Sequence, residues 1–480
     1  WCHPSVDAFR APEALLPARP RRLRFRPPRD LAGLAIASLA LAAGCGSPPD
    51  PRPNVLLITL DTTRADRLGC YGHERDTSPN LDALAGDGIR CDLAIATAAL
   101  TPVAHASILT GLLPQNHGVR VIYAASGYRL PDAVPTLTTV LGEAGWRTGA
   151  FLSAFPVSDF YGFDRGFDTF DSGLGHTSED VLEETREGHW GFDIEANQRR
   201  SDDTTDAALE WIGGSRDPFF AWIHYWDPHD PLLVPPRDVA DRYQPEIALS
   251  RPVQQRALYD AEIHWMDRQI GRVLDALRER GEYDDTIIVV VSDHGEGLGD
   301  HDHWYHRILY QEQIRVPLIL RLPGAETGRV VKELVRTTDI FPTVLEALEL
   351  DPSGQIDGWP LQDLLAGRDP GPRHGYADAL ILYDLNAQDL LEKRPQDDVL
   401  HCYMDARWKL IHRPLRPEES ELYDLREDPR ELRNVYAEEP ERAGELLARL
   451  EATDPLVDGP FGEGGDAEAI ERLRALGYVD

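Results

Sequence analysis

The sequence predicts an α/β protein built around a parallel or mixed β-sheet that helices cover on both faces. Short runs rich in branched and aromatic residues alternate with helical periodicity from Asn54 to about Pro323, which is the pattern of such a sheet. At 480 residues the chain is long enough to bury a full core. Its 42% apolar and 27% charged residues are typical of a globular protein and not of a disordered or coiled-coil chain.

The individual elements follow from local composition. Five segments are dense enough in β-branched and aromatic residues to be predicted as strands: residues 55–60, 146–153, 219–226, 286–292 and 316–320. The clearest helix runs from about residue 259 to 280, because its apolar residues share one face and Gly281 stops it. A further helix starts at Ser78-Pro79, with Ser78 as the N-cap and proline at the first helical position.

The texture of the chain changes after residue 370, where a shorter segment with acidic turns begins. It contains one predicted strand over residues 407–412 and one predicted helix from about residue 439 to 451. We therefore expect a large domain over residues 54–370 and a small C-terminal α+β subdomain over residues 371–480, preceded by a Pro-rich linker over residues 45–53.

The N-terminal segment is an export signal. An arginine cluster over residues 19–29 is followed by an apolar run over residues 31–44 that is too short to span a bilayer. The sequence LAAGC that ends at Cys45 resembles a bacterial lipobox, which predicts a signal peptide over residues 1–44 and a lipid on Cys45. A plain signal peptide cut near Ala43 is the alternative. We expect an exported protein, periplasmic or anchored to the outer membrane through the lipid alone.

The net charge limits the classes of binding partner, and the number of cysteines limits the possible disulfides. A formal net charge of −33 argues against nucleic acid as a partner and makes polyanionic substrates unfavourable unless the pocket is locally positive. Beyond the signal, Cys70, Cys91 and Cys402 are an odd number, so no complete disulfide framework exists, although Cys70 and Cys91 could pair in an oxidising compartment. The sequence does not indicate the oligomeric state.

Three predicted strands end in residues that can bind a cation. The first runs into Asp61, the third into Asp227 and His229, and the fourth into Asp293 and His294. Sites in open α/β sheets lie at the carboxyl ends of the strands. Each of these residues alone could be a helix cap or turn residue, but three such endings together favour a site.

A fourth segment, TPVAH, joins Thr101 to His105 at a predicted helix start. Threonine as N-cap and proline at the first helical position are ordinary helix-start chemistry. The same geometry aims a hydroxyl and free backbone N–H groups at one point, which suits a tetrahedral oxyanion.

Six segments together carry a family resemblance. They resemble, in order, successive signatures of the sulfatase family within the alkaline phosphatase superfamily: residues 55–72 (VLLITLDTTRADRLGCYG), 78–88 (SPNLDALAGDG), 101–119 (TPVAHASILTGLLPQNHGV), 291–300 (VSDHGEGLGD), 310–317 (YQEQIRVP) and 421–434 (ELYDLREDPRELRN). The resemblance implies an alkaline-phosphatase-like mixed, mostly parallel sheet and a hydrolase of sulfate or phosphate esters. The expected substrate is a small-molecule, glycan or lipid ester.

The departures from the family pattern concern the nucleophile and the metal. Formylglycine-dependent sulfatases carry Cys or Ser, then x-Pro-x-Arg, at the nucleophile position, whereas the resemblance places Thr101 there and His105 at the arginine. Those enzymes also have an Asp-Asp pair and an Asp-Asn pair, whereas here threonine follows Asp61 and His294 follows Asp293. With one carboxylate fewer and one imidazole more, zinc or manganese is favoured over calcium. We expect Asp61, Thr101, Asp293 and His294 to hold one divalent ion.

The resemblance also implies roles for other histidines. Thr101 would attack phosphorus or sulfur, and water would release the covalent intermediate. His229 and His306 would hold the non-bridging oxygens or protonate the leaving oxygen, or else bind a second ion, together with His301 or His303. Two further imidazoles have open roles: His105 contacts the nucleophile or makes a helix hydrogen bond, and His117 touches the substrate or fixes a loop. Three carboxylates are expected to be solvated: Glu296, Asp300 and Asp302.

Two alternatives to this hydrolase stay open. A threonine nucleophile with a single metal is also typical of phosphodiesterases and phosphoethanolamine-type transferases. The rival from another class is a catalytically silent, lipid-anchored binding protein on the sulfatase scaffold. Such a protein would have residues that cannot bind a metal at the ligand positions, whereas the four predicted ligands are all chemically competent.

Overall fold

The structure is a computed structural model that describes residues 52–454 apart from 123, 125, 173–197, 230–232, 244–250, 352–353, 369–370 and 385–387. The predicted signal peptide, Cys45 and most of the linker lie outside the described residues. Within the described part, no helix has both the length and the apolar character that crossing a membrane requires.

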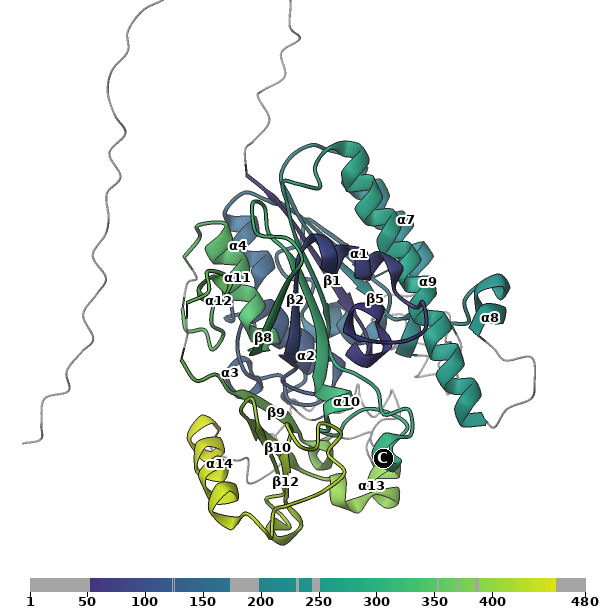
Figure 1. Ribbon diagram of the computed structural model, residues 1–480. Helices are drawn as coiled ribbons and strands as arrows, with labels where there is room; N and C mark the ends of the chain where they lie inside the picture. The colour runs from purple at the N-terminus through teal and green to yellow at the C-terminus, as the bar shows by residue number, and fades with distance from the viewer. Residues whose placement is uncertain are drawn as a thin grey trace, which may run out of the picture. The chain divides into compact units, whose positions relative to one another are not determined.

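The larger part is organised around a mixed eight-stranded sheet of order β4-β3-β5-β1-β6-β7-β2-β8 (Figure 1). Only β7 runs antiparallel to its neighbours β6 and β2, and the other neighbouring pairs are parallel. The predicted mixed, mostly parallel sheet is therefore confirmed. The strands are β1 (Asn54–Leu60), β2 (Ile89–Ile95), β3 (Arg147–Leu152), β4 (Thr169–Asp171), β5 (Phe219–Tyr225), β6 (Thr286–Ser292), β7 (Arg315–Arg321) and β8 (Arg329–Arg336).

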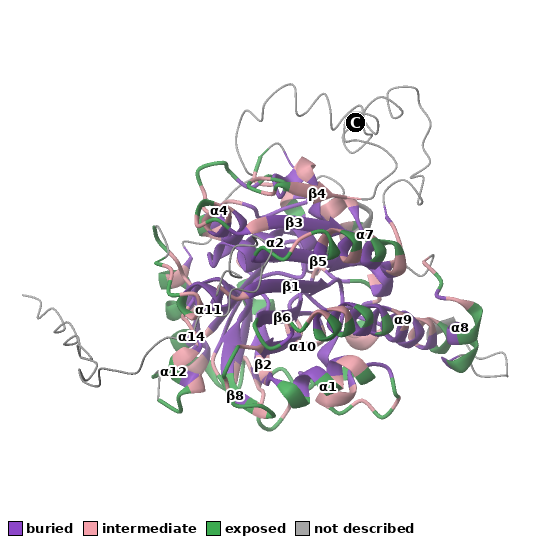
Figure 2. Ribbon diagram, turned by 90° about the horizontal axis from the view of Figure 1, so that it is seen from above, coloured by how far each residue is buried: buried purple, intermediate pink, exposed green. Residues whose placement is uncertain are grey.

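Helices cover both faces of this sheet, as the view from above shows (Figure 2). Alternate residues of β1 point to opposite faces, so Val55 and Leu57 join one apolar cluster, and Leu56 and Ile58 join the other. The first cluster is closed by α2 (Thr101–Thr110), α4 (Leu137–Glu143) and α11 (Ile340–Ala347), and the second by α1 (Pro79–Asp87), α7 (Ser201–Gly213) and α9 (Arg251–Arg280). The central strands β1, β5 and β6 are buried along their whole length, which fixes the positions of their ends.

A second sheet is formed by the C-terminal part. Four antiparallel strands have the order β12-β11-β10-β9, and α14 packs on them (Figure 1). A buried cluster joins this part to the first, because Arg120 forms ion pairs with both Asp378 and Asp454. The elements are β9 (Gly375–Ala379), β10 (Leu400–Met404), β11 (Trp408–His412), β12 (Glu421–Asp424) and α14 (Pro440–Thr453); the remaining α-helices of the described residues are α3 (Pro114–His117), α8 (Arg237–Tyr243), α10 (Gln311–Ile314), α12 (Gln362–Leu365) and α13 (Gln388–Lys393).

The five predicted strands of the large domain correspond to β1, β3, β5, β6 and β7, whereas β2, β4 and β8 were missed. The helix predicted from residue 259 begins earlier, at Arg251. Ser78 does precede α1, but its hydroxyl bonds Asp82 and the Gly69 N–H instead of capping the helix. The suggested pairing of Cys70 with Cys91 is wrong, since both are free and pack against clusters on opposite faces of the sheet.

Candidate active site

The side chains predicted to bind a metal meet at the carboxyl ends of β1 and β6. These strands are neighbours, and Leu60 pairs with Ser292, so Asp61 and Asp293 follow directly at the same edge. One ligand atom each from Asp61, Asp293 and His294 lies within 4.8 Å of the others, and all three side chains are buried. Thr101 enters from the start of α2, with its hydroxyl oxygen 3.3 Å from His294 Nε2. The structure thus brings together all four predicted ligands.

Hydrogen bonds on the outer side of Asp293 and His294 aim the remaining atoms inward. Asp293 Oδ1 accepts the backbone N–H groups of Thr62 at 3.1 Å and His294 at 2.7 Å, which leaves Oδ2 for the centre. His294 Nδ1 lies 3.0 Å from the Gly295 carbonyl oxygen and donates to it. The lone pair of His294 is therefore on Nε2, the nitrogen that faces Thr101. Such second contacts fix the tautomer and orientation of metal-binding imidazoles.

The donor set fits a divalent cation. Asp61 Oδ1 and Asp293 Oδ2 are buried and accept no hydrogen bond, a costly arrangement for carboxylates unless a cation lies between them. Burial raises the pKa of both carboxyl groups well above the ordinary range, and the charge of Asp293 raises that of Asp61 further. A bound ion would remove both penalties, because it replaces the protons that these carboxyl groups otherwise need.

Thr101 is the first residue of α2 and not its N-cap, which corrects the expectation from the sequence. The N-cap is Leu100, in an extended conformation, and no side chain caps the helix start. Pro102 follows inside the first turn. The Thr101 hydroxyl is therefore not used on a backbone N–H of its own helix and stays directed at His294. It also lies at the positive end of the helix dipole, which favours a negative oxygen there.

His105 makes the helix hydrogen bond and not the contact with the nucleophile. Its Nδ1 lies 2.8 Å from the backbone carbonyl oxygen of Thr101, one turn earlier, and 3.5 Å from Asp293 Oδ2. Burial lowers the pKa of His105 to about 3, so the ring is neutral and donates from Nδ1. Through this bond His105 holds the first turn of α2 beside Asp293, and its catalytic role stays a prediction.

His306 lies beside the predicted metal ligand His294, and His229 lies beside His306. The His306 ring is centred 4.6 Å from that of His294 and 5.1 Å from that of His229. His229 stacks on Trp226 with ring centres 3.7 Å apart, which fixes its plane. Burial lowers the pKa of His306 to about 3, and the positive charge of Arg307 contributes. Arg307, which the sequence reasoning did not single out, has a backbone φ of 96°, a strained value for a residue other than glycine.

Two other predicted residues have different tasks. His117 accepts a hydrogen bond from the Val119 N–H at 3.1 Å and donates to the Ser107 hydroxyl oxygen at 2.9 Å, so no ring nitrogen is left for a substrate. Asp227 accepts hydrogen bonds from the backbone N–H and the hydroxyl of Ser201, the first residue of α7. His117 therefore fixes a loop, and Asp227 caps a helix.

The suggested second metal set is not assembled. His301 pairs with Glu312 at 2.7 Å, and His303 Nδ1 donates to the Tyr305 carbonyl oxygen at 2.8 Å. In the described part of the chain, the group with metal-binding geometry contains neither of them. Glu296, expected to be solvated, is only 6% exposed, and burial raises its pKa to about 8. Asp300 is likewise not free, because it pairs with Arg64 at 2.9 Å.

His224 is a site residue that the sequence reasoning missed. It lies inside β5, and its Nε2 is 3.2 Å from Asp61 Oδ2, to which it donates. The ring is fully buried, and burial keeps its pKa well below the ordinary value, so it is a neutral donor. A lone imidazole within the apolar run FFAWIHY was the available signal, because a buried histidine needs a partner.

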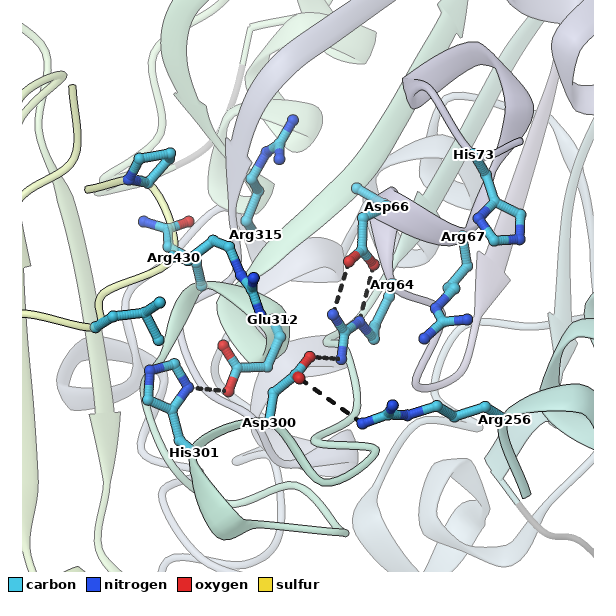
Figure 3. A pocket seen from close by; sticks show the side chains of 14 residues that line it. Arg64, Asp66, Arg67, His73, Arg256, Asp300, His301, Glu312, Arg315 and Arg430 are labelled. Atoms are coloured by element: carbon cyan, nitrogen blue, oxygen red, sulfur yellow. Dashed lines mark hydrogen bonds and ion pairs between the residues drawn. The ribbon is translucent and has the colours of Figure 1, made fainter. Parts of the chain in front are cut away.

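Arg64 is the second missed residue, and it ties the two ligand-bearing loops together. Figure 3 shows its guanidinium between the carboxylates of Asp66 and Asp300, which belong to the loops after β1 and β6. It also donates to the carbonyl oxygens of Glu296 and Gly297, both at 3.2 Å. The cavity in this view has a volume of about 520 Å³ and is lined by none of the metal ligands. Arg64 therefore joins the two loops that carry the predicted ligands.

Comparisons with known proteins agree with this geometry. The architecture is that of the alkaline-phosphatase-like enzymes, and the family model "Sulfatase" matches residues 53–350. The chain therefore belongs to the sulfatase family and is an ester hydrolase of that family. A second model, "N-sulphoglucosamine sulphohydrolase, C-terminal", matches residues 299–453.

Relatives and solved structures extend the likeness over most of the chain. An arylsulfatase of Clostridium perfringens is 28% identical over 81% of this chain and 91% of its own. An N-acetylglucosamine-6-O-sulfatase of Bacteroides thetaiotaomicron is 26% identical over 90% and 91%. Among structures, a phosphonate monoester hydrolase of Agrobacterium radiobacter has a TM-score of 0.68 at 25% identity and covers 84% of this chain and 95% of its own. A complex with D-glucosamine-2-N,6-O-disulfate has a TM-score of 0.69 at 23% identity, over 84% and 97%.

Proposed function

We propose that this protein is a metal-dependent hydrolase of sulfate or phosphorus esters that works through a covalent ester of Thr101. One observation carries the proposal: the Thr101 hydroxyl lies 3.3 Å from His294 Nε2, beside two buried carboxylate oxygens that accept no hydrogen bond. Hydroxyl, imidazole and carboxylate together are the donor types of a catalytic metal centre.

Asp61, Asp293 and His294 would hold the ion, with Thr101 as the fourth ligand. A set with one imidazole and two carboxylates suits zinc or manganese better than calcium, which prefers six to eight oxygen ligands. The ion, when bound, lowers the pKa of the hydroxyl and offsets charge on the ester oxygens. His224 and His105 keep Asp61 and the first turn of α2 in place while this happens.

The proposed hydrolysis proceeds through two displacements in which the chain's own residues take part. Thr101 Oγ would bond to sulfur or phosphorus while the bond to the leaving oxygen breaks, and the hydroxyl proton would be released to solvent. The leaving alcohol takes up one proton. Water then attacks the threonine ester, which releases sulfate or phosphate and restores the hydroxyl.

His229, His306 and Arg307 supply the contacts around the transferred group. The His306 ring is centred 4.6 Å from that of His294, and the His229 ring is centred 5.1 Å from that of His306, so these imidazoles could donate to non-bridging oxygens or to the leaving oxygen. Burial is the main cause that lowers the pKa of both imidazoles, and the positive charge of Arg307, which pairs with Asp384 at 3.6 Å, contributes. An anionic ester would be attracted by the same charge.

Sulfate and phosphorus esters are both represented among the similar proteins. The arylsulfatase and the N-acetylglucosamine-6-O-sulfatase are named for sulfate esters, and the Agrobacterium radiobacter structure is that of a phosphonate monoester hydrolase. Thr101 and His294, in place of the residues of formylglycine-dependent enzymes, favour phosphorus esters. The discriminating assay compares nitrophenyl sulfate, phosphate, phosphodiester and phenylphosphonate substrates, each with added zinc, manganese or calcium.

The test of the mechanism uses two substitutions at one position. Thr101→Ala is expected to lower kcat by about a thousandfold or more while metal binding and thermal stability stay near wild type, and Thr101→Ser is expected to retain measurable turnover. A mass increase at Thr101 after rapid quenching would identify the covalent ester. Unchanged turnover in Thr101→Ala would remove this residue from the mechanism.

The silent-scaffold alternative makes the opposite prediction for the metal. Intact ligands within 4.8 Å of one another argue against it. Metal analysis after dialysis should find about one zinc or manganese ion per wild-type chain and much less in Asp293→Ala. The absence of bound metal in both proteins, together with the absence of turnover, would favour a binding protein. Faster turnover on adding an alcohol acceptor would instead indicate a transferase.

We also propose that the chain is exported and anchored by a lipid on Cys45. The support is the arginine-rich segment, the apolar run and the lipobox-like LAAGC, all outside the described residues. Expression in a bacterial host with labelled palmitate is expected to label wild type and not Cys45→Ala. Equal labelling of the two proteins would contradict the lipid on Cys45 and leave the plain signal peptide as the remaining prediction.

A further inference from the structure

The cavity around Arg64, which we call the arginine cavity, lies where several distant segments of the chain meet (Figure 3). Its lining residues come from the loops after β1 and β6, from α9, from α10 and the first residue of β7, and from the loop after β12. The last loop belongs to the segment ELYDLREDPRELRN over residues 421–434, which has no role in the proposed reaction. At about 520 Å³ the cavity has the size of a small-molecule site.

Positive side chains outnumber negative ones in the arginine cavity. Five arginines and three carboxylates are among its lining residues, a surplus of two positive charges with the histidines counted as neutral. The chain as a whole has a formal net charge of −33, so this local surplus departs from its overall balance. A cavity of this kind attracts anions from solution. The arginines are Arg64, Arg67, Arg256, Arg315 and Arg430, and the carboxylates are Asp66, Asp300 and Glu312.

The three carboxylates already have partners inside the cavity. Asp66 and Asp300 pair with Arg64 at 2.7 and 2.9 Å. Glu312 pairs with His301 at 2.7 Å. Their pairing is therefore complete without a guanidinium group from the C-terminal part.

Arg430 and Arg315 keep N–H groups that a ligand can use. Within the described residues Arg430 forms neither a hydrogen bond nor an ion pair, and it is exposed. Arg315 donates from Nε to the Asp92 carbonyl oxygen at 3.1 Å, and its two terminal nitrogens have no acceptor in the part of the chain that the structure describes. Guanidinium groups with free nitrogens bind oxyanions through paired N–H donors.

Gln311 contributes an unused amide to the same cavity. Both its Oε1 and its Nε2 are buried, and neither has a hydrogen-bond partner among the residues with a described position. A buried amide without partners is costly, and such groups commonly bond a ligand or an ordered water. The Nε2 group can donate to an oxygen of an anion in the cavity.

We propose that the arginine cavity binds a small oxyanion with two negative charges, of the class of inorganic sulfate and phosphate. Arg430 and Arg315 would offset its charge, and Gln311 would donate an additional hydrogen bond. This binding does not rest on the proposed ester hydrolysis, because none of the metal ligands lines the cavity. The anion would join the loop after β12 to α10 and β7, which gives this loop of the C-terminal part a binding role.

The binding test compares two ions of similar shape. The full chain is titrated in a calorimeter with sulfate and with methanesulfonate, which also has a tetrahedral sulfur but carries one negative charge, at constant ionic strength. Sulfate is expected to bind at the cavity at least about tenfold more tightly, which corresponds to about 1.4 kcal/mol. An affinity for sulfate no higher than that for methanesulfonate would overturn the proposal.

Two forms of the protein separate the cavity from the reaction centre. In the zinc-loaded form sulfate can also bind at the metal, whereas in the chelated form no cation is there to hold it. The stoichiometry is expected to fall by one sulfate per chain between wild type and Arg430→Glu in both forms. This result does not depend on turnover, so a chain that binds sulfate at the cavity but hydrolyses no ester would contradict the proposed function alone.

The control variant carries the same change of charge in the same loop. Arg426→Glu replaces an exposed arginine after β12 that does not line the cavity, and it should leave sulfate binding unchanged. Arg430→Ala and Gln311→Leu are each expected to weaken sulfate binding several-fold. Equal binding in wild type and Arg430→Glu would overturn the proposal, because Arg430 would then not belong to the site. An equal loss in Arg426→Glu would also overturn it, because binding would then reflect the overall charge of the chain.

Discussion

His224 provides the sharpest test of how the fold prepares the metal centre. Its Nε2 donates to Asp61 Oδ2 at 3.2 Å from within β5, and no ion contact is required of it. His224→Phe keeps the ring volume beside His105, whose ring centre is 5.1 Å away, and removes only the donor. A hydrogen bond to a charged acceptor contributes about 1.5–3 kcal/mol. Loss of such outer contacts weakens metal binding by about 10–100-fold, in agreement with that range.

The assay titrates metal-free protein with zinc against a chelating dye and then follows ester hydrolysis as a function of zinc concentration. His224→Phe should move both curves to higher zinc by one to two orders of magnitude while most of the activity at saturating zinc is retained. The control is His374→Phe, which replaces a stacked imidazole of the C-terminal part, 5.2 Å from Tyr403, and should leave zinc affinity unchanged. An unaltered zinc Kd in His224→Phe would refute the role assigned to this imidazole.

Three further predictions follow from the same geometry. Arg64→Lys, which cannot bridge Asp66, Asp300 and two carbonyls at once, is expected to lower the free energy of unfolding by about 1–3 kcal/mol, measured by denaturant titration; a loss within experimental error would show that the two loops do not depend on it. Burial raises the pKa of Asp61 and Asp293, so metal-free folded protein keeps protons that the unfolded chain releases above about pH 4. The contribution of these protons to the stability of metal-free protein is therefore fully present below that pH and falls as pH rises. A bound ion replaces those protons, so the difference in Tm between zinc-loaded and chelated protein should widen with pH. A constant difference would contradict this. His117→Leu should lower Tm, with a cost of about 1–3 kcal/mol for lost buried hydrogen bonds, and leave KM unchanged, whereas a raised KM would restore its predicted contact with substrate.

The accuracy of the strand predictions depended on burial. β1, β5 and β6 are buried on both faces and read as continuous apolar runs, so composition located them. β8 lies at the edge of the sheet and is half charged (RVVKELVR), and β4 has only three residues. These two strands exist because a neighbouring strand supplies their hydrogen bonds, which is a contact that local composition does not encode.

The predictions for the site also succeeded or failed according to contacts that the sequence does not encode. Asp61, Asp293 and His294 were found because they lie at the ends of buried strands, and the meeting of strand ends at one edge is a general property of such sheets. Asp227 lies after β5 in the same way but is engaged by Ser201, and His117, which the resemblance indicated, is engaged by Ser107 and Val119. Which polar side chain remains free is decided by every atom around it, and this is known only once the chain is folded.

The sequence by itself determined the family and the sheet type and predicted the reacting groups, since these depend on patterns along the chain and on residue chemistry. Tertiary structure alone decided which atom of each group faces the centre: Asp293 Oδ2, His294 Nε2 and the Thr101 hydroxyl. It also recruited His224 and Arg64, whose partners lie more than 160 and 230 positions away. The physical reason is that hydrogen bonds and charge act over a few ångströms in space, whatever the distance along the chain.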